Sequence, residues 1–507
     1  MPQDPIEGTK HFARFTLPNG EAVDGEFLLD GPQSCVILYI DRHHAVRSGD
    51  FTTLHASLPV KGWLSFLSCI RLGEETAYSG QEWQSHRVRL YPHFATLGPR
   101  VLSPGAPICR LSIVADDFAA IYYDFDAFGV DLAPEEHIGE ILQCFRTRIG
   151  RRVEPGDRPM IVYFTGRNHL FSAAAPFGRV SARHRVDHGM GGPKGVSINN
   201  AVLTDLDFDP PITFDQAIHN LRSVLRFLEL IAGRRQNLLH IELELDLPKD
   251  CPDSILKVYW CSPPNRPTVA GEREPHPADL PLNGGIQPTE FAAVLERWLE
   301  VDYERRDARV QFSDGFSNGN QYDVGRLVSS ANMFDILPAN AVPVKVDLPE
   351  GLQTARSEAR QIFKALPQSA ERDSVLSALG RLGRASLRHK ACHRGQIVLT
   401  ETAERLPDLK LVLEAAVNCR NHYVHGGPAR IDYRDHFFET VPFFTDTLEF
   451  VFAASDLIEA GWSIVPWLQQ GTTGSHPFGS YCANYKDNLR ALKALLDATG
   501  GNGIVTE

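Results

Sequence analysis

The stretch DLKLVLEAAVNCRNHYVHGGP, residues 408–428, decides the fold of its domain. Its apolar residues recur at helical intervals, and Gly-Gly-Pro at the end is a strong stop signal. The spacing predicts a helix over residues 408–424, with Asp408 as its N-cap. The last turn of this helix carries the sequence Arg-Asn-His-Tyr-Val-His, residues 420–425.

Three side chains of this turn suit phosphodiester chemistry. Arg420 is a permanent cation whose planar fork fits phosphate oxygens, and His425 can transfer protons near neutral pH. Asn421, four residues before His425, shares its helix face and can orient either group. Arg420 and His425 lie about 140° apart around an ideal helix, so we expect them to converge poorly within one helix. A second copy of the helix would complete the site; a loosened last turn at Gly426 is the alternative.

The rest of the C-terminal half also has a helical pattern, punctuated by proline. We expect an all-α domain over residues 289–507, with helices at 289–305, 322–337, 352–366, 371–394, 408–424, 437–460 and 485–498.

The N-terminal half predicts an α+β region over residues 1–261, mostly short strands with a few helices, as one subdomain or two. Residues 35–40 and 160–166 have the composition of buried strands, and 238–247 alternate between apolar and polar. A helix over 213–231 opens with a Thr213…Gln216 capping box. Seven prolines in residues 262–288 predict a linker that runs over the surface.

Arg-Asn-x-x-x-His at a helix end resembles the HEPN motif, and the chain as a whole resembles ApeA-like anti-phage defence proteins. Residues 15–31 (FTLPNGEAVDGEFLLDG) and 211–233 (PITFDQAIHNLRSVLRFLELIAG) are similar to that family's N-terminal region. The resemblance implies a C-terminal HEPN helical bundle and an anti-phage effector of the abortive-infection type. Where many relatives carry a glutamate in the helix at 322–337, this chain offers Asn332 and Asp335.

The resemblance also implies an endoribonuclease that needs no metal or cofactor. In it Arg420 would hold the phosphate, His425 would act as general base or acid and Asn421 would position them. The ribose 2′-hydroxyl would attack, leaving a 2′,3′-cyclic phosphate. The implied partners are RNA, with tRNA as one candidate, a second copy of the chain in a homodimer or higher even oligomer, and a phage-derived trigger sensed by the N-terminal region.

Other interpretations of the motif stay open. Arginine and histidine at a helix end can simply satisfy the last carbonyls and the helix dipole. A HEPN fold can also be a catalytically silent module for binding or dimerisation, acting as a sensor or scaffold. Cys419, His422 and His425 are metal-ligand types, but their i, i+3, i+6 spacing puts Cys419 and His425 on opposite sides of a helix, so we predict no metal site.

The distribution of charge bears on RNA binding. The net charge of −12 argues against a constitutive, non-specific nucleic-acid binder. Residues 354–394, however, hold nine basic against three acidic side chains. Arg381, Arg384 and Arg388 stand at helical spacing and would form one ridge for RNA phosphates, with His422 beside the site. A solvated helix face is the alternative.

Composition indicates the compartment. The nine cysteines lack framework spacing, which is typical of a reducing cytoplasm. The polar, acidic start does not have the pattern of a secretory signal, and no apolar run approaches 18 residues. We therefore expect a soluble cytoplasmic protein without a membrane segment.

Overall fold

The computed structural model describes residues 8–17, 20–40, 51–58, 62–79, 82–193, 195–248, 254–263, 273–402, 404–426 and 429–500. The chain divides into two compact units. The first comprises Met1–Arg222, Gln236–Asn265 and Leu282–Ala292, and the second Ser223–Arg235, Arg266–Pro281 and Ala293–Glu507. None of the helices in the described residues has both the length and the apolar character that a membrane span requires.

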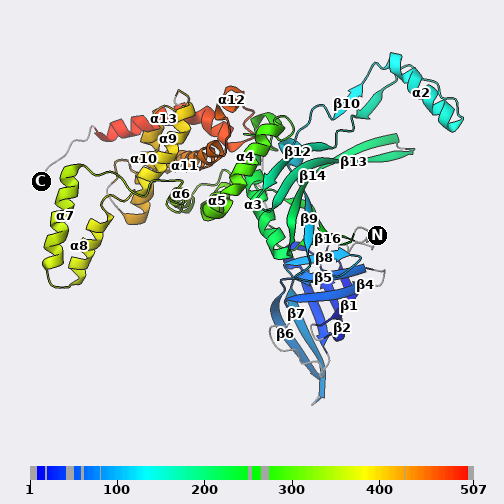
Figure 1. Ribbon diagram of the computed structural model, residues 1–507, viewed down its shortest axis with the longest axis horizontal. Helices are drawn as coiled ribbons and strands as arrows, with labels where there is room; N and C mark the ends of the chain where they lie inside the picture. The colour runs from blue at the N-terminus through cyan, green and yellow to red at the C-terminus, as the bar shows by residue number, and fades with distance from the viewer. Residues whose placement is uncertain are drawn as a thin grey trace. The chain divides into compact units, whose positions relative to one another are not determined.

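The first unit is built on one antiparallel sheet of 14 strands, in the order β12-β13-β14-β9-β15-β16-β8-β5-β4-β1-β2-β3-β7-β6 (Figure 1). Its strands are β1 (Lys10–Thr16), β2 (Ala22–Leu28), β3 (Cys35–Ile40), β4 (Thr53–Leu58), β5 (Gly62–Leu67), β6 (Ile70–Ser79), β7 (Glu82–Tyr91), β8 (Phe94–Gly98), β9 (Ile108–Ala115), β12 (His169–Ala175), β13 (Gly178–Gly192), β14 (Gly195–Ile212), β15 (Leu238–Leu245) and β16 (Ile255–Trp260). A separate pair is formed by β10 (Phe128–Asp131) and β11 (Ile161–Phe164).

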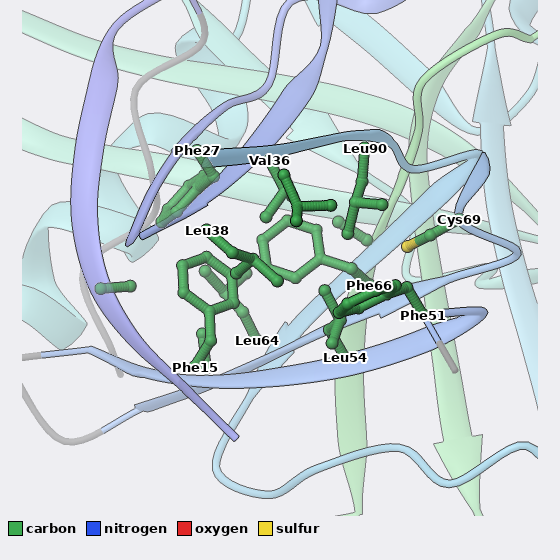
Figure 2. Packing of buried hydrophobic residues seen from close by; sticks show 14 of the residues in the cluster. Phe15, Phe27, Val36, Leu38, Phe51, Leu54, Leu64, Phe66, Cys69 and Leu90 are labelled. Atoms are coloured by element: carbon green, nitrogen blue, oxygen red, sulfur yellow. The ribbon is translucent and has the colours of Figure 1, made fainter. Parts of the chain in front are cut away.

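An aromatic cluster fills the core over strands β1 to β5. Phe15, Phe27 and Phe66 are at most 1% exposed and meet with ring centroids 5.5–5.7 Å apart. Aliphatic side chains such as Leu38 and Leu64 surround them, as Figure 2 shows. The alternation of β-strand side chains explains why these residues share one face.

Several strand predictions can be compared with the sheet. Residues 35–40 form β3 as predicted. The alternation predicted for 238–247 is present in β15 from Ile241 to Leu245, whereas Leu239, predicted on the same face, is exposed. The predicted buried strand at 160–166 is wrong in its burial. It forms β11, whose Val162 and Tyr163 are about half exposed because it pairs only with β10. Strands β13 and β14 form a ribbon far longer than the short strands expected (Figure 1).

The first unit and its borders also contain α1 (Phe118–Ile121), α2 (Glu135–Ile149) and α3 (Phe214–Ala232). One half of the capping box predicted for α3 is present: the backbone N–H of Thr213 donates to Gln216 Oε1 at 3.0 Å. The remaining helices are α4 (Pro288–Glu300), α5 (Asp302–Phe316), α6 (Val324–Asn332), α7 (Glu350–Ala365), α8 (Ala370–Arg381), α9 (Leu387–Thr402), α10 (Leu409–His425), α11 (Phe437–Glu459), α12 (Ile464–Gln469) and α13 (Pro477–Gly500).

The fold class is confirmed, since strands dominate the N-terminal region and the C-terminal region is helical. Two predicted helices are each divided. Residues 289–305 contain the junction of α4 and α5, and residues 371–394 contain the turn between α8 and α9. In the turn between α8 and α9, Gly383 has φ +83°, a left-handed conformation that cannot continue a helix. Glycine adopts this conformation more readily than other residues.

Buried ion pairs hold the helices of the second unit together. Asp456 of α11 accepts hydrogen bonds from Arg305 at 2.6 Å and from Arg309 at 2.9 Å, both on α5. Arg394 of α9, 1% exposed, donates to Glu459 at 2.5 Å. Although burial opposes its ionised form, the arginines hold the pKa of Asp456 low, at about 2. These charges are matched inside the bundle, which fixes how α5, α9 and α11 pack.

The proline-rich stretch at 262–288 is only partly described. The prediction that it runs over the surface is wrong for its C-terminal part, where Asp279, Leu282 and Asn283 are at most 3% exposed. The buried carboxylate of Asp279 accepts hydrogen bonds from Thr473 and Ser475. Residues 264–272 lie outside the described residues.

Candidate active site

Helix α10 carries the predicted site and is packed closely on α9. Gly395 of α9 makes this approach possible, because a Cβ there would lie 2.4 Å from Leu413 Cδ1. Val412 and Ala416 of α10 are completely buried. The periodic apolar face that predicts the helix is therefore the face that α10 buries.

The start of α10 is fixed by its neighbour α13. Asp408 is the N-cap residue as predicted, with φ +57°, but its side chain forms no capping hydrogen bond. Its carboxylate instead accepts from Lys493 at 2.6 Å. Tyr485 donates to the carbonyl of Pro407 at 2.8 Å. These two contacts fix the turn before α10, as a capping hydrogen bond would otherwise do.

The end of α10 explains where the functional side chains stand. Gly426 is the C-cap with φ +69°, and its N–H donates to the carbonyl of His422 at 2.9 Å. Glycine suits this left-handed conformation, so the helix stops directly after His425. The unpaired carbonyls of the last turn favour positive charge, which suits Arg420. Gly427 and Pro428 lie outside the described residues.

Arg420, Asn421 and His425 form one cluster within a single chain. Arg420 Nη1 donates to Asn421 Oδ1 at 3.0 Å and lies 3.4 Å from His425 Nε2. Arg420 and Asn421 are half-buried, whereas His425 is exposed. The expectation that Arg420 and His425 converge poorly on one helix is thus wrong. Rotation around the axis describes the Cα atoms, and the long arginine side chain spans the remaining separation.

The contact with Arg420 suggests the tautomer of His425. A guanidinium can only donate hydrogen bonds, so the ring nitrogen that faces it accepts through a lone pair. A hydrogen bond at this contact requires the lone pair of Nε2, and therefore a ring whose proton is on Nδ1. A neutral imidazole with its ring exposed is able to take a proton from a bound substrate.

Asn332 is a fourth member of the cluster and comes from α6. Its Oδ1 accepts from Arg420 Nη2 at 2.7 Å, across 88 residues of chain. Together Asn332 and Asn421 hold both terminal nitrogens of Arg420. The only signal for Asn332 in the sequence is its place in the helix where the resembling family often has glutamate. Asp335, the other residue noted there, pairs with Lys390 at 3.0 Å.

His422 faces a different environment. Its ring lies 5.4 Å from the ring of Tyr423 and 5.4 Å from that of Tyr433. Tyr423 also donates to the carbonyl of Tyr433 at 3.0 Å. These contacts attach residues 429–436 to the end of α10, and the RNA contact predicted for His422 stays a prediction.

The three arginines predicted to line an RNA path do not share one helix. Arg381 is the last residue of α8, Arg384 lies in the following turn, and Arg388 belongs to α9. All three are exposed, and Arg388 donates to Asn418 of α10 at 2.8 Å. The predicted ridge is therefore wrong as a helical ridge, because Gly383 breaks the helix.

Part of the basic excess at 354–394 is used inside the fold. Arg394 is buried in the ion-pair network, and Lys390 pairs with Asp335. Arg356 and Arg372 donate to backbone carbonyls of Leu379 and Phe363 at 2.9 Å, which joins α7 to α8. The count of basic residues thus overstates the charge that is open to RNA.

The Cys419 thiol is buried and chemically quiet. Cys419 is 0% exposed, and burial raises its pKa to about 12, so it remains a thiol at neutral pH. Metal binding requires the thiolate. In the described part of the chain, no group of three histidine, cysteine or acidic side chains is arranged to hold a metal ion.

Comparison with known proteins bears on this helical region. Residues 328–464, which run from within α6 to the first residue of α12, match the family model described as Apea-like HEPN. No curated protein and no solved structure matches the chain. The matched segment contains Asn332, Arg420, Asn421 and His425. The C-terminal part of this chain therefore carries an Apea-like HEPN domain.

Proposed function

We propose that this chain is an anti-phage effector whose HEPN domain is a metal-independent endoribonuclease. The match to the Apea-like HEPN family supports an anti-phage HEPN effector. The observation that carries the nuclease assignment is the cluster at the end of α10, in which Arg420 contacts Asn421 and His425 at 3.0 and 3.4 Å. A fixed cation beside an exposed imidazole is the pair of groups that RNA cleavage needs.

The reaction uses the nucleophile that RNA itself carries. His425 takes the proton of the ribose 2′-hydroxyl as the 2′ oxygen bonds to phosphorus, and the bond from phosphorus to the 5′ oxygen breaks. Arg420 binds the phosphate and stabilises the negative charge that develops on it. The products are a 2′,3′-cyclic phosphate and a 5′-hydroxyl, the latter formed when the leaving oxygen gains a proton.

The proton balance favours two copies of the chain. One histidine cannot remove the 2′ proton and protonate the 5′ oxygen at the same time. A symmetric dimer in which two α10 ends meet supplies a second His425 for the second transfer. His425 and Val424 are exposed at this end of α10, so the surface required for such a pairing is accessible. The N-terminal region is proposed to sense a phage-derived trigger and to release the nuclease.

Cleavage of tRNA and of a single-stranded RNA in EDTA tests the proposal. We expect purified full-length protein, with or without lysate from phage-infected cells, to produce cyclic phosphate ends. His425→Ala and Arg420→Ala should abolish them, whereas the exposed His393→Ala should retain them. DNA, which lacks the 2′-hydroxyl, should stay intact.

Two results would contradict the assignment. One is full cleavage by Arg420→Ala. The other is the absence of cleavage by the wild type even with infected lysate, which would favour a silent HEPN binding or dimerisation module.

A further inference from the structure

A cavity of about 300 Å³ lies in the second unit and shares no lining residue with the Arg420 cluster. Its walls come from the 3-10 turn at Pro277–Asp279, the turn between α9 and α10, α12 and α13. Ligand cavities in proteins span roughly 300–1,000 Å³, so this one is at the small end. It has room for a compact molecule with one ring system.

A network of hydrogen bonds to Asp279 fixes the rim of the cavity. The Asp279 carboxylate accepts from the backbone N–H and the hydroxyl of Thr473 at 2.8 and 2.6 Å, and from those of Ser475 at 2.8 and 2.7 Å. Burial favours its protonated form, but these four hydrogen bonds outweigh burial and hold its pKa below the usual range. Trp467 donates to the carbonyl of Asp279 at 3.0 Å. The one acidic group in the wall is thus engaged in holding the 472–475 loop.

Two cations stand at the cavity with no hydrogen-bonded or ion-paired partner in the part of the chain that the structure describes. Arg405, in the turn between α9 and α10, and Lys486, on α13, are both exposed and line the cavity. Within the described residues, neither side chain forms a hydrogen bond or an ion pair. Nearby Arg490 and Lys493 are, by contrast, paired with Asp487 and Asp408. In a chain of net charge −12, two unpaired cations at one cavity favour an anionic ligand.

The inner wall is apolar. Leu406 and Trp467 are at most 8% exposed and line the cavity together with Leu468. Cys482 completes this wall, and burial raises its pKa to about 12, so it presents an unreactive thiol. An apolar wall below two cations suits a molecule with a flat ring at one end and a phosphate at the other.

We propose that this cavity binds a small phosphomonoester that carries one flat ring system. Arg405 and Lys486 contact the phosphate, and the ring packs against Leu406, Trp467 and Leu468. The site does not depend on the nuclease assignment, because binding requires none of the residues at the end of α10.

Calorimetric titration of the full-length protein tests the site with three probes: phenyl phosphate, adenosine monophosphate and inorganic phosphate. We expect at least one of the two ring esters to bind more tightly than inorganic phosphate. Which of the two binds more tightly shows whether the site prefers a nucleoside or a smaller aromatic ring. Removing both cations in Arg405→Ala/Lys486→Ala should weaken this binding by about 100-fold, as expected for two charge-assisted hydrogen bonds.

Two further variants separate binding from folding. Ala483→Trp keeps both cations but fills the cavity from an exposed position on α13, and should also abolish binding. Arg490→Ala, on the same helix but outside the cavity, should bind as the wild type does. The proposal is overturned if neither ring ester binds the wild type, if the double variant binds as tightly, or if inorganic phosphate binds as well as the esters.

Discussion

Arg420 Nη1 lies 3.4 Å from Nε2 of His425, although five positions along one helix separate the two residues. Arg420 contacts Asn421 and His425 through Nη1 and Asn332 through Nη2, whereas the three donors of a lysine ammonium share one nitrogen. Arg420→Lys should therefore lower the rate of RNA cleavage by about 100-fold or more, the effect of losing one well-aimed donor to the phosphate. The exposed Arg430→Lys is the matched control, and equal rates for both variants would contradict the role of Arg420.

Asn332 holds Arg420 from α6, and its removal should affect the rate more than binding. Asn332→Ala leaves Arg420 Nη2 without its acceptor, so we expect kcat to fall about tenfold with KM and Tm nearly unchanged. Asp335→Asn breaks the neighbouring pair with Lys390 and serves as control. A loss of Tm without a change in kcat would show that Asn332 only stabilises the fold.

Arg381 and Arg384 are exposed, and their proposed contact with RNA can be measured by salt dependence. Each phosphate contact to a single strand contributes about 0.7 to the slope of log K against log salt. On a His425→Ala background, Arg381→Ala and Arg384→Ala should each reduce this slope by about that amount in fluorescence anisotropy. Arg297→Ala, an exposed arginine paired with Glu300, should leave the slope unchanged. Unchanged slopes in all three variants would exclude an RNA path along these arginines.

Asp446 should make stability depend on pH. Burial and the nearby Glu449 raise its pKa to about 7, although Tyr322 donates to it. The folded state then binds more protons than the unfolded state between about pH 4 and pH 7, so this group lowers the free energy of unfolding as pH rises through that window. Asp446→Asn should be more stable than the wild type by about 4 kcal/mol at pH 8 and similar near pH 4.

Urea unfolding at pH 4.5, 6 and 8 measures the effect of Asp446→Asn. The exposed Asp435→Asn should show no such trend. A stability difference between Asp446→Asn and the wild type that is the same at every pH would contradict the raised pKa of Asp446.

Arg394 shows that a basic residue of the 354–394 stretch can be structural. Arg394→Ala removes its bonds to Ser455 and Glu459 inside the bundle, so the free energy of unfolding should fall by about 3 kcal/mol. The adjacent exposed His393→Ala should change it little. Equal stability of the two variants in urea would mean that the buried network contributes nothing.

Local signals predicted local structure well. The predicted helix at 408–424 is α10 within one residue at each end, because its apolar period and the glycine after His425 act within a few residues. The strand at 35–40 is β3 for the same reason.

Features that depend on tertiary packing could not be predicted from local sequence signals. The burial of Arg394 depends on partners more than 50 residues away, and a count of basic residues cannot register it. Asn332 is brought to Arg420 by the packing of α6 on α10, and Arg405 from the turn before α10 meets Lys486 of α13 at one cavity. The approach of Arg420 to His425 depends on a side-chain conformation, which residue spacing does not specify.

The grip of Asn332 and Asn421 on Arg420 has an entropic consequence. A free arginine side chain loses about 2 kcal/mol of rotamer entropy when it is immobilised. Arg420 is immobilised when the domain folds, so in the proposed reaction it meets the RNA already oriented. In the predicted RNA contacts, the exposed side chains of Arg381 and Arg384 lose this rotamer entropy each time RNA binds. The contact of Arg420 with a phosphate is therefore not weakened by this entropy loss. The free energy of each contact from an exposed arginine is reduced by it.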